Sequence, residues 1–491
     1  MRITKIEIKD FRGFPGDYIF DLKSHGKNLL VYGENGSGKS SLFHALDGFL
    51  QASRNKAEIT VHKNIFSKPG EPLVKLEVVG LDKEGNRLPE SGSYEWSEAA
   101  SPAGQPMIEA AAKTRGCLDY KALLRTHYVH LEFDRVDLFE LLIDALLPHY
   151  ENPITRVPFK EEWQNIRSAV SGRLDTRVKG RLVKQLEGFN DGLANVLGPL
   201  EGEANKLLTY FDRGVSITLR LVSKASLKSG PKELTAPQIH LSVDYAKTAI
   251  PAHHRFLNEE RLSAIALAVY FASLLLYPAS ALRVLVLDDV LIGLDMSNRL
   301  PVLDILRERF AEWQIILLTH DKVWYELVWL QTENGKDWCY LKLFCQLDPE
   351  EGFDRPTYLR HGEGAADLLV RAREHLASND ERAAALYARL ALEVKLKRYC
   401  DKNGVPVAYN RDPRKVQAQA FWDAVRPHAF DKYRNDAAVL ASLESSFASI
   451  EALRKVVLNP LSHSGVATVV KAEVKQAIDV VDGLSFPKLD E

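Results

Sequence analysis

The sequence predicts an α/β domain that contains an inserted helical hairpin and is followed by an all-α domain. Two short apolar runs, 28–32 and 284–287, are typical of strands buried on both faces of a parallel sheet. Apolar residues recur every three or four positions over 166–197, which indicates helices. From about residue 364 the pattern changes to several amphipathic helices. The expected divisions are an N-terminal lobe (1–150), a helical arm (151–213), a C-terminal lobe (214–350) and a helical domain (360–491).

Composition restricts the possible function classes. The 491 residues have 46% hydrophobic and 26% charged side chains and a formal net charge of −2, so any nucleic-acid surface must be a local patch. No apolar run reaches the length of a membrane span, and the N-terminus alternates like a strand rather than a signal peptide. Four scattered cysteines form no Cys-x-x-Cys pair, which disfavours a zinc site and favours a reducing cytoplasm. We therefore expect a cytoplasmic protein without membrane contact.

The segment Gly33–Ser40 reads GENGSGKS and fits the phosphate-loop pattern Gly-x4-Gly-Lys-Ser. It lies between a predicted strand and a predicted helix, where its glycines let backbone N–H groups turn toward phosphates. We expect Lys39 to reach the β- and γ-phosphates of ATP and the Ser40 hydroxyl to ligate Mg²⁺. Further ATP-binding residues expected in this segment are Asn35, Gly36, Ser37, Gly38 and Ser41.

Two later strands end in polar residues that could complete this site. The run 284–287 ends in Asp288 and Asp289, and Asp288 is expected to hold Mg²⁺ directly or through water. The run 314–318 ends in Thr319–Asp321, where His320 could hydrogen-bond the γ-phosphate or the attacking water. A histidine at a strand end can also be purely structural, and we favour the functional role because the carboxylate strand precedes it at a suitable distance.

These segments resemble the ABC-type ATPase heads of RecF and SMC proteins. Residues 6–14 (IEIKDFRGF) resemble the opening strand and turn of that group, and 257–272 resemble its signature segment. Gly293–Asp295 and Thr319–Asp321 resemble its D-loop and switch-histidine loop. The resemblance implies an ATPase that uses ATP and Mg²⁺ and forms a homodimer or higher oligomer through heads that sandwich ATP. The residues that it assigns are Asp289 and His320 to catalysis and Arg12, Asn258 and Asp295 to nucleotide binding.

Two departures from that pattern affect the expected activity. Asp289 stands where the family usually has glutamate, and its side chain is one methylene shorter, so we expect slow hydrolysis that suits a switch. The signature Leu-Ser-Gly-Gly-Gln/Glu is replaced by Leu257–Arg261 (LNEER). Asn258 can still cap a helix, whereas Glu259 and Glu260 would repel phosphate. Either this loop takes a different path or ATP-driven closure is weakened. No Q-loop glutamine can be assigned.

Within the predicted arm, the helical stripe starts after Pro158 and is expected to end at Gly198–Pro199. Folded as a hairpin, it would reach about 30–40 Å at the helical rise per residue. It is locally basic, which means either a solvated face or a contact with the phosphate backbone of a nucleic acid. The basic residues are Arg167, Arg173, Arg177, Lys179, Arg181 and Lys184.

The C-terminal domain contains a possible second site. Arg389 and Glu393 share a helix face, and Asn459 and His463 follow much later. This set resembles the nuclease part of the anticodon nucleases PrrC and RloC, which implies metal-free RNA cleavage with His463 moving the 2′-hydroxyl proton. Leu458 occupies the arginine position of the related HEPN motif. The alternative, which we favour, is an ion pair within one helix and a capping turn between two helices.

Stand-alone heads of this size are typical of the PtuA and RloC types of anti-phage ATPase and of DNA-repair systems. The first hypothesis is therefore an ATP-gated sensor or scaffold in phage defence that acts with a nuclease, either a separate subunit or its own C-terminal domain. Nucleic acid is an expected partner. The alternative is a RecF-like DNA-repair ATPase without toxic output. A transporter ATPase is disfavoured by the altered signature and the FRGF turn.

Overall fold

The computed structural model divides the chain into two compact units, Met1–Arg360 and His361–Glu491. All the predicted ATP-binding motifs lie in the first unit. The structure describes residues 1–54, 58–67, 71–80, 82, 87–114, 116–121, 136–171, 176–227, 234–332, 337–347, 352–360, 365–377, 380–407, 418–453 and 470–486.

A six-stranded sheet forms the centre of the first unit, in the order β16-β15-β3-β14-β13-β6. Its strands are β3 (Asn28–Gly33), β6 (Cys117–Asp119), β13 (Val284–Asp288), β14 (Gln314–Thr319), β15 (Trp338–Leu347) and β16 (Asp354–Arg360). All neighbouring pairs are parallel except β15 and β16. The strands β3, β13 and β14 are buried along their whole length, as predicted. Their carboxyl ends therefore meet at one edge, where the three motifs begin.

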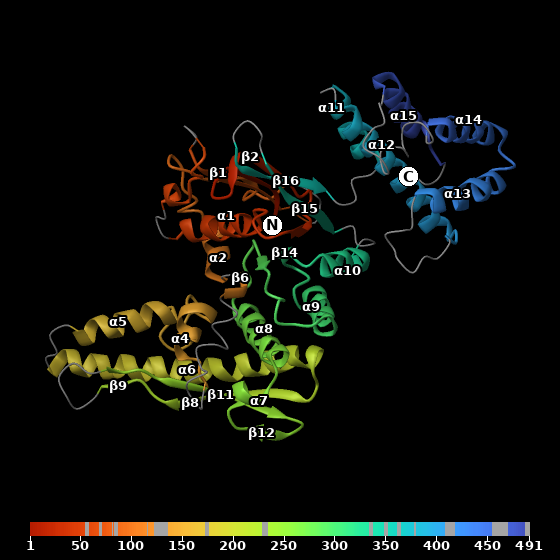
Figure 1. The fold of residues 1–491 in the computed structure, drawn as a ribbon. Coiled ribbons are helices and arrows are strands. Elements are labelled where there is room, and N and C mark those ends of the chain that lie inside the picture. Colours follow the sequence, from red (N-terminus) through yellow and green to blue (C-terminus); the bar gives the residue numbers. More distant parts are fainter. Residues whose placement is uncertain are drawn as a thin grey trace. The chain divides into compact units, whose positions relative to one another are not determined.

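A second, antiparallel sheet packs with helix α1 (Lys39–Ala52) against one face of the central sheet (Figure 1). Its order is β2-β1-β4-β5, with β1 (Arg2–Phe11), β2 (Phe14–Asp21), β4 (Leu73–Val79) and β5 (Gly92–Trp96). One core joins Ile6 of β1, Phe49 of α1 and Ile316 of β14. The buried Gln314 side chain links the two sheets, because it donates to the Ile3 carbonyl and accepts the Ile3 N–H, both at 2.7 Å. Also on this side are η1 (Ile59–His62) and α2 (Pro106–Thr114).

The other side of the central sheet belongs to a larger core that includes helices from the C-terminal lobe. Helix α8 (Glu259–Leu276) is buried all round from Ser263 to Leu274, which explains its long apolar run. Helices α9 (Met296–Arg309) and α10 (Lys322–Thr332) follow β13 and β14. Over the described residues, no helix combines the length and the apolarity needed to cross a bilayer.

The arm consists of α5 (Phe159–Ser171) and the 36-residue helix α6 (Thr176–Phe211), which also packs on α8 (Figure 1). The predicted end at Gly198–Pro199 is wrong, because Pro199 lies inside α6. Pro199 and Asn195 are both exposed, so the carbonyl that loses its helical donor faces water. The predicted apolar stripe is buried at Ile166, Val170, Leu182, Leu186, Phe189, Leu193 and Leu197, while Leu174 lies outside the described residues.

Short elements complete the first unit around the arm. Strands β8 (Val215–Ser223) and β11 (Gln238–Tyr245) pair antiparallel, and β8 contacts α6. The remaining elements are β7 (Val136–Asp137), α4 (Phe139–Leu141), η2 (Leu142–Leu146), β9 (Ser226–Leu227), β10 (Leu234–Thr235), β12 (Thr248–Ile250) and α7 (His253–Phe256). Together they place the start of α8 beside the end of α6.

The second unit is helical throughout its described part, as predicted. It contains α11 (Ala365–Ala377), α12 (Glu381–Asn403), α13 (Ala418–Lys432), α14 (Ala437–Leu453) and α15 (Lys471–Gly483). Trp422 and Phe447 belong to the hydrophobic core of this unit. Helix α12 ends at Gly404, whose φ of 62° favours glycine. The chain thus combines an α/β head, a helical arm and an all-α C-terminal unit.

Candidate nucleotide-binding site

The phosphate loop connects β3 to α1, and its glycines are required by its geometry. Gly36 and Gly38 have φ angles of 87° and 101°, which side chains other than hydrogen rarely adopt. A Cβ on Gly33 would lie 2.2 Å from the Ser37 Oγ. Ser37 is itself buried, and within the described residues its Oγ has no hydrogen-bond partner. The loop is therefore a tight backbone cradle that contains an unsatisfied hydroxyl, which fits a phosphate group.

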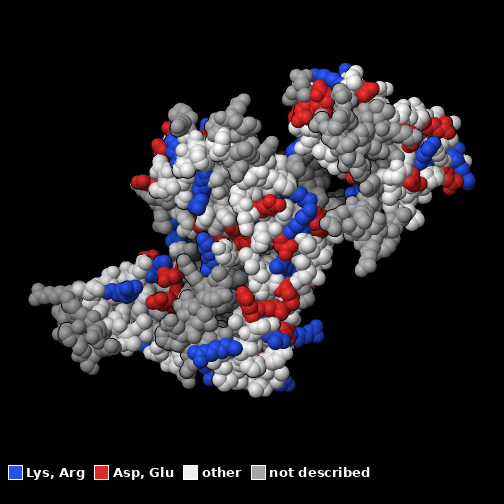
Figure 2. All heavy atoms as spheres, viewed as in Figure 1, with Lys and Arg blue, Asp and Glu red and all other residues white. Residues whose placement is uncertain are grey.

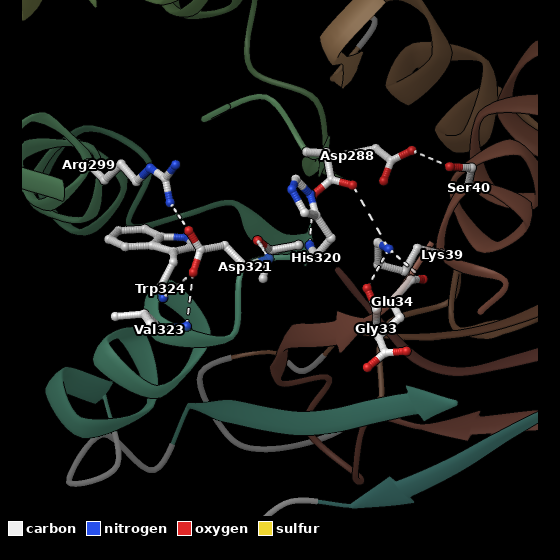
Figure 3. A network of polar contacts seen from close by, with 12 residues as sticks. Gly33, Glu34, Lys39, Ser40, Asp288, Arg299, His320, Asp321, Val323 and Trp324 are labelled. Carbon is white, nitrogen blue, oxygen red and sulfur yellow. Dashed lines mark hydrogen bonds and ion pairs between the residues drawn. The ribbon is translucent and has the colours of Figure 1, made fainter. Parts of the chain in front are cut away.

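The Lys39 side chain is 5% exposed and folds back across this loop (Figure 3). Its Nζ donates to the Gly33 carbonyl at 2.6 Å and the Glu34 carbonyl at 3.1 Å, and lies 3.9 Å from the Asp289 Oδ2. Burial lowers the pKa of Lys39, and the charges of Asp289 and Asp288 oppose that change. The ammonium can exchange its two carbonyl contacts for phosphate oxygens without leaving the loop.

Ser40 and Asp288 meet at the first turn of α1. The Ser40 hydroxyl donates to the Asp288 Oδ2 at 2.9 Å, while the buried Oδ1 of Asp288 has no partner among the described residues. Burial raises the pKa of Asp288 to about 6, with further increases from Asp289 and Asp119 that Ser40 and Lys39 oppose. A hydroxyl and an unsatisfied carboxylate oxygen at one point are the hard oxygen donors that Mg²⁺ prefers.

Asp289 is held by the loop that follows β14. Its Oδ1 lies 2.8 Å from both the backbone nitrogen and the ring Nδ1 of His320. A carboxylate oxygen accepts, so the backbone N–H and the ring Nδ1–H of His320 can both donate to the same Asp289 oxygen. The Asp289 side chain is 14% exposed and that of His320 is 40% exposed. The pair can therefore orient a water molecule and take part in its deprotonation.

The β1–β2 turn lies against the start of α1. The exposed Arg12 has a φ of 48°, and its backbone N–H donates to the His62 carbonyl at 2.7 Å. The Gly13 N–H donates to the Ser41 Oγ at 3.1 Å, which ties the turn to the phosphate loop. Asn35 is exposed at the tip of that loop.

Asn258 and Asp295 occupy the N-termini of two helices. The Asn258 Oδ1 accepts the Arg261 N–H at 3.2 Å and caps α8, and the Asp295 Oδ1 accepts the Asn298 N–H at 3.1 Å and caps α9. The two segments touch, because a Cβ on Gly293 would lie 2.3 Å from the Ser263 Oγ of α8. In this structure both side chains therefore serve as helix caps.

Arg261 and Glu260, within the altered signature, make their own contacts. The Arg261 guanidinium donates to the Asp212 Oδ2 at 3.2 Å and the Tyr245 hydroxyl at 3.0 Å, and lies 4.5 Å from the Tyr245 ring centre. These partners lie at the end of α6 and on β11. Burial and the neighbouring Asp295 raise the pKa of Glu260. The signature is thus joined to the arm on one side and the D-loop on the other.

Sequence reasoning missed two features of the site. Asp119 ends β6 directly opposite Asp288 in the parallel register, but its three-residue strand is too short to give a recognisable pattern. Arg299 of α9 pairs with Asp321 beside His320, and such a contact between loops has no sequence signal. Both features place charge beside the predicted residues.

The predicted nuclease residues are only partly described. Arg389 Nε lies 3.3 Å from the Glu393 Oε1 within α12, and both side chains are about four-fifths buried. This is the ion pair of the favoured alternative. His463, Asn459 and Leu458 lie outside the described residues, so their proximity to Arg389 stays a prediction.

Across the described chain, no three or more His, Cys, Asp or Glu side chains are grouped to hold a metal ion. Figure 2 shows basic and acidic side chains mixed over the visible face, in keeping with the net charge of −2.

Comparisons with known proteins give one family match. The model described as "RecF/RecN/SMC N terminal domain" matches residues 2–332. A comparison with curated proteins finds no match.

Similar solved structures include the SmcHead bound to the C-winged helix domain of ScpA, with 15% identity, coverage of 74% of this chain and 99% of that chain, and a TM-score of 0.42. An Smc head with an extended coiled coil, bound to the C-terminal domain of ScpA from Pyrococcus furiosus, has 16% identity, coverage of 76% and 99%, and a TM-score of 0.43. The SMC head domain from Thermotoga maritima has 14% identity, coverage of 73% and 99%, and a TM-score of 0.36.

Proposed function

The chain belongs to the RecF/RecN/SMC N-terminal domain family, and from that premise we propose that it binds Mg-ATP in its phosphate loop and hydrolyses it slowly. One observation carries this proposal. The Ser40 hydroxyl and the Asp288 carboxylate come from positions 248 residues apart and meet at 2.9 Å, beside an unsatisfied carboxylate oxygen. A Mg²⁺ ion bound to these oxygens would neutralise charge on the β- and γ-phosphates.

The remaining steps belong to the chain's own side chains. Lys39 would leave the carbonyls of Gly33 and Glu34 for phosphate oxygens. Asp289 would accept a hydrogen bond from the attacking water while His320 holds its carboxylate in place. Hydrolysis is slow in this proposal because the Asp289 side chain is one methylene shorter than the glutamate usual at this position, so its carboxylate reaches the attacking water less closely.

The Lys39→Ala variant tests nucleotide binding. It removes the ammonium inside the loop, so ATP affinity measured by calorimetry with Mg²⁺ should fall more than tenfold, and phosphate release should fall to background. Lys206→Ala is the matched control, because that lysine is 68% exposed on α6 and should leave both quantities unchanged. Equal ATP affinity in the Lys39→Ala and Lys206→Ala variants would rule out the proposed site.

We further propose that two heads pair around ATP. The support comes from large apolar side chains exposed at the segments that would meet in such a pair. Phe256, just before the signature segment, is 71% exposed, and Ile292, just before the D-loop, is 52% exposed. Burial of such side chains would favour association. Light scattering of an Asp289→Asn variant with and without Mg-ATP should show an ATP-dependent dimer, and a monomer in both conditions would contradict this proposal.

For the cellular role, we propose a nucleotide-gated scaffold in phage defence that acts with a nuclease. The family match and the separate core of the helical C-terminal unit support a head that carries an effector or docking module. The alternative is a RecF-like DNA-repair ATPase. Infection of expressing cells separates the two, because defence requires growth arrest with cleaved tRNA or DNA that is lost in Lys39→Ala. The DNA-repair alternative predicts ATP-dependent DNA binding without toxicity to the cells.

A further inference from the structure

Asp321 ends the loop that carries His320, and its two carboxylate oxygens have different tasks. Oδ1 accepts the backbone N–H groups of Val323 at 2.9 Å and Trp324 at 3.0 Å and so caps α10. Oδ2 accepts a hydrogen bond from the Arg299 guanidinium and forms an ion pair with it (Figure 3). The first task fixes the start of the helix, and the second ties this loop to another part of the chain.

Arg299 comes from the D-loop side of the site. It lies in the first turns of α9, and its Nε donates to the Leu294 carbonyl at 2.8 Å. Its side chain is 14% exposed and that of Asp321 is 29% exposed. A guanidinium with two fixed acceptors loses little further freedom and defines geometry better than an exposed pair does. Arg299 therefore connects the D-loop backbone to the His320 loop.

The ion pair lies beside the Asp289–His320 contact. Arg299, Asp321, Asp289 and His320 line one common pocket. The Asp289 Oδ1 lies 2.8 Å from both the backbone nitrogen and the ring Nδ1 of His320, and this arrangement depends on where the His320 backbone lies. A shift of about 1 Å in such a group can cost up to 100-fold in rate.

We propose that Arg299 is a positioning residue that joins the Leu294 carbonyl to Asp321 and thereby holds His320 against Asp289 during ATP hydrolysis. The inference rests on the proposed ATPase function. The contacts of Arg299 lie with Leu294 and Asp321 rather than at the phosphate loop, so its loss should slow turnover while nucleotide binding is kept.

The test compares wild type with Arg299→Gln, Arg299→Lys and Arg307→Gln. Arg307 is the matched control, because it lies on the same helix and forms an exposed ion pair with Asp304 at 3.2 Å. We expect Arg299→Gln to lower kcat at least tenfold while the Kd for Mg-ATP, measured by calorimetry, changes less than twofold. Arg299→Lys, which keeps the charge, should recover part of kcat, and Arg307→Gln should match wild type.

Three results would overturn the inference alone, and a fourth would overturn it together with the proposed function. Turnover in Arg299→Gln equal to that in Arg307→Gln would show that the pair does not position His320. A parallel loss of ATP affinity and kcat in Arg299→Gln, or no recovery in Arg299→Lys, would mean a general structural role. In each of these three cases, the proposed ATPase function still holds if the wild-type protein turns over faster than Lys39→Ala. Wild-type turnover equal to that of Lys39→Ala would remove the proposed function and this inference together.

Discussion

The phosphate loop and the signature segment keep the family pattern to very different degrees. The loop has every required residue, and neither its buried Ser37 hydroxyl nor the Oδ1 of Asp288, at the end of β13, has a partner among the described residues. The signature has lost its glycines, and its side chains already have partners within the chain: Asn258 caps α8 and Arg261 reaches Asp212. The residues expected to bind ATP within one head are therefore kept, whereas those expected to pair two heads around ATP are altered.

The two carboxylates of the signature sharpen this contrast. Glu259 and Glu260 occupy the first turn of α8, where negative charge interacts favourably with the positive end of the helix dipole. In the proposed pair of heads this helix end would face the phosphates of the partner's ATP. The two glutamates therefore offset the positive end of the α8 dipole, which would otherwise attract a phosphate group.

The largest expected effect concerns Mg²⁺ and pH. Metal binds the ionised carboxylate, and the pKa of Asp288 is raised to about 6, so apparent Mg²⁺ affinity should fall about tenfold for each pH unit below 6. Between pH 3.8 and about 6, the Asp288 carboxyl group is protonated in the folded state but ionised in the unfolded state. The free energy of unfolding without Mg²⁺ should therefore decrease as pH rises through that window.

Calorimetric titration of Mg²⁺ with ATP at several pH values checks this prediction. The Asp288→Asn variant is its control, because it cannot titrate and should lose the step near pH 6. A wild-type affinity that is constant from pH 5 to 7, after correction for protonation of ATP, would contradict the assignment of Asp288 as a Mg²⁺ ligand.

A smaller effect is expected at the signature. Replacing both Glu259 and Glu260 with glutamine removes the repulsion of phosphate, so ATP-dependent dimerisation should strengthen several-fold. The same change removes a favourable helix-end interaction worth about 0.3–1 kcal/mol per charge, so the melting temperature should fall slightly. Sedimentation with and without ATP measures the first quantity. If dimerisation does not change, α8 does not face the partner's nucleotide.

The smallest effect is expected at the arm. Arg177, Lys179 and Arg181 are exposed at the start of α6, and their reversal to glutamate should weaken duplex DNA binding. Each lost phosphate contact lowers the slope of log K against log salt by about 0.9. The control variant reverses Lys206, Lys224 and Lys247 to glutamate, which gives the same change in net charge. Equal slopes in wild type and both variants would mean that the basic residues of α6 only face solvent.

The sequence predicted the central strands and their terminal residues because fully apolar runs and a complete phosphate-loop motif leave few alternatives. It did not predict that α6 continues through Pro199, since the exposed position that makes this proline tolerable is a tertiary property. Asp119 and the Arg299–Asp321 pair were also missed. They depend on which strands become neighbours and how two loops pack, and local patterns contain neither kind of information.

Phosphate release measured in Asp289→Glu, Asp289→Asn and wild type tests the central claim most directly. The claim is that a complete ATP site, with Asp289 positioned by His320, turns over slowly because the Asp289 side chain is one methylene shorter than glutamate. It predicts faster turnover in Asp289→Glu, and no turnover but retained ATP binding in Asp289→Asn. Identical phosphate release in all three proteins would contradict it, because Asp289 would then have no part in orienting the attacking water.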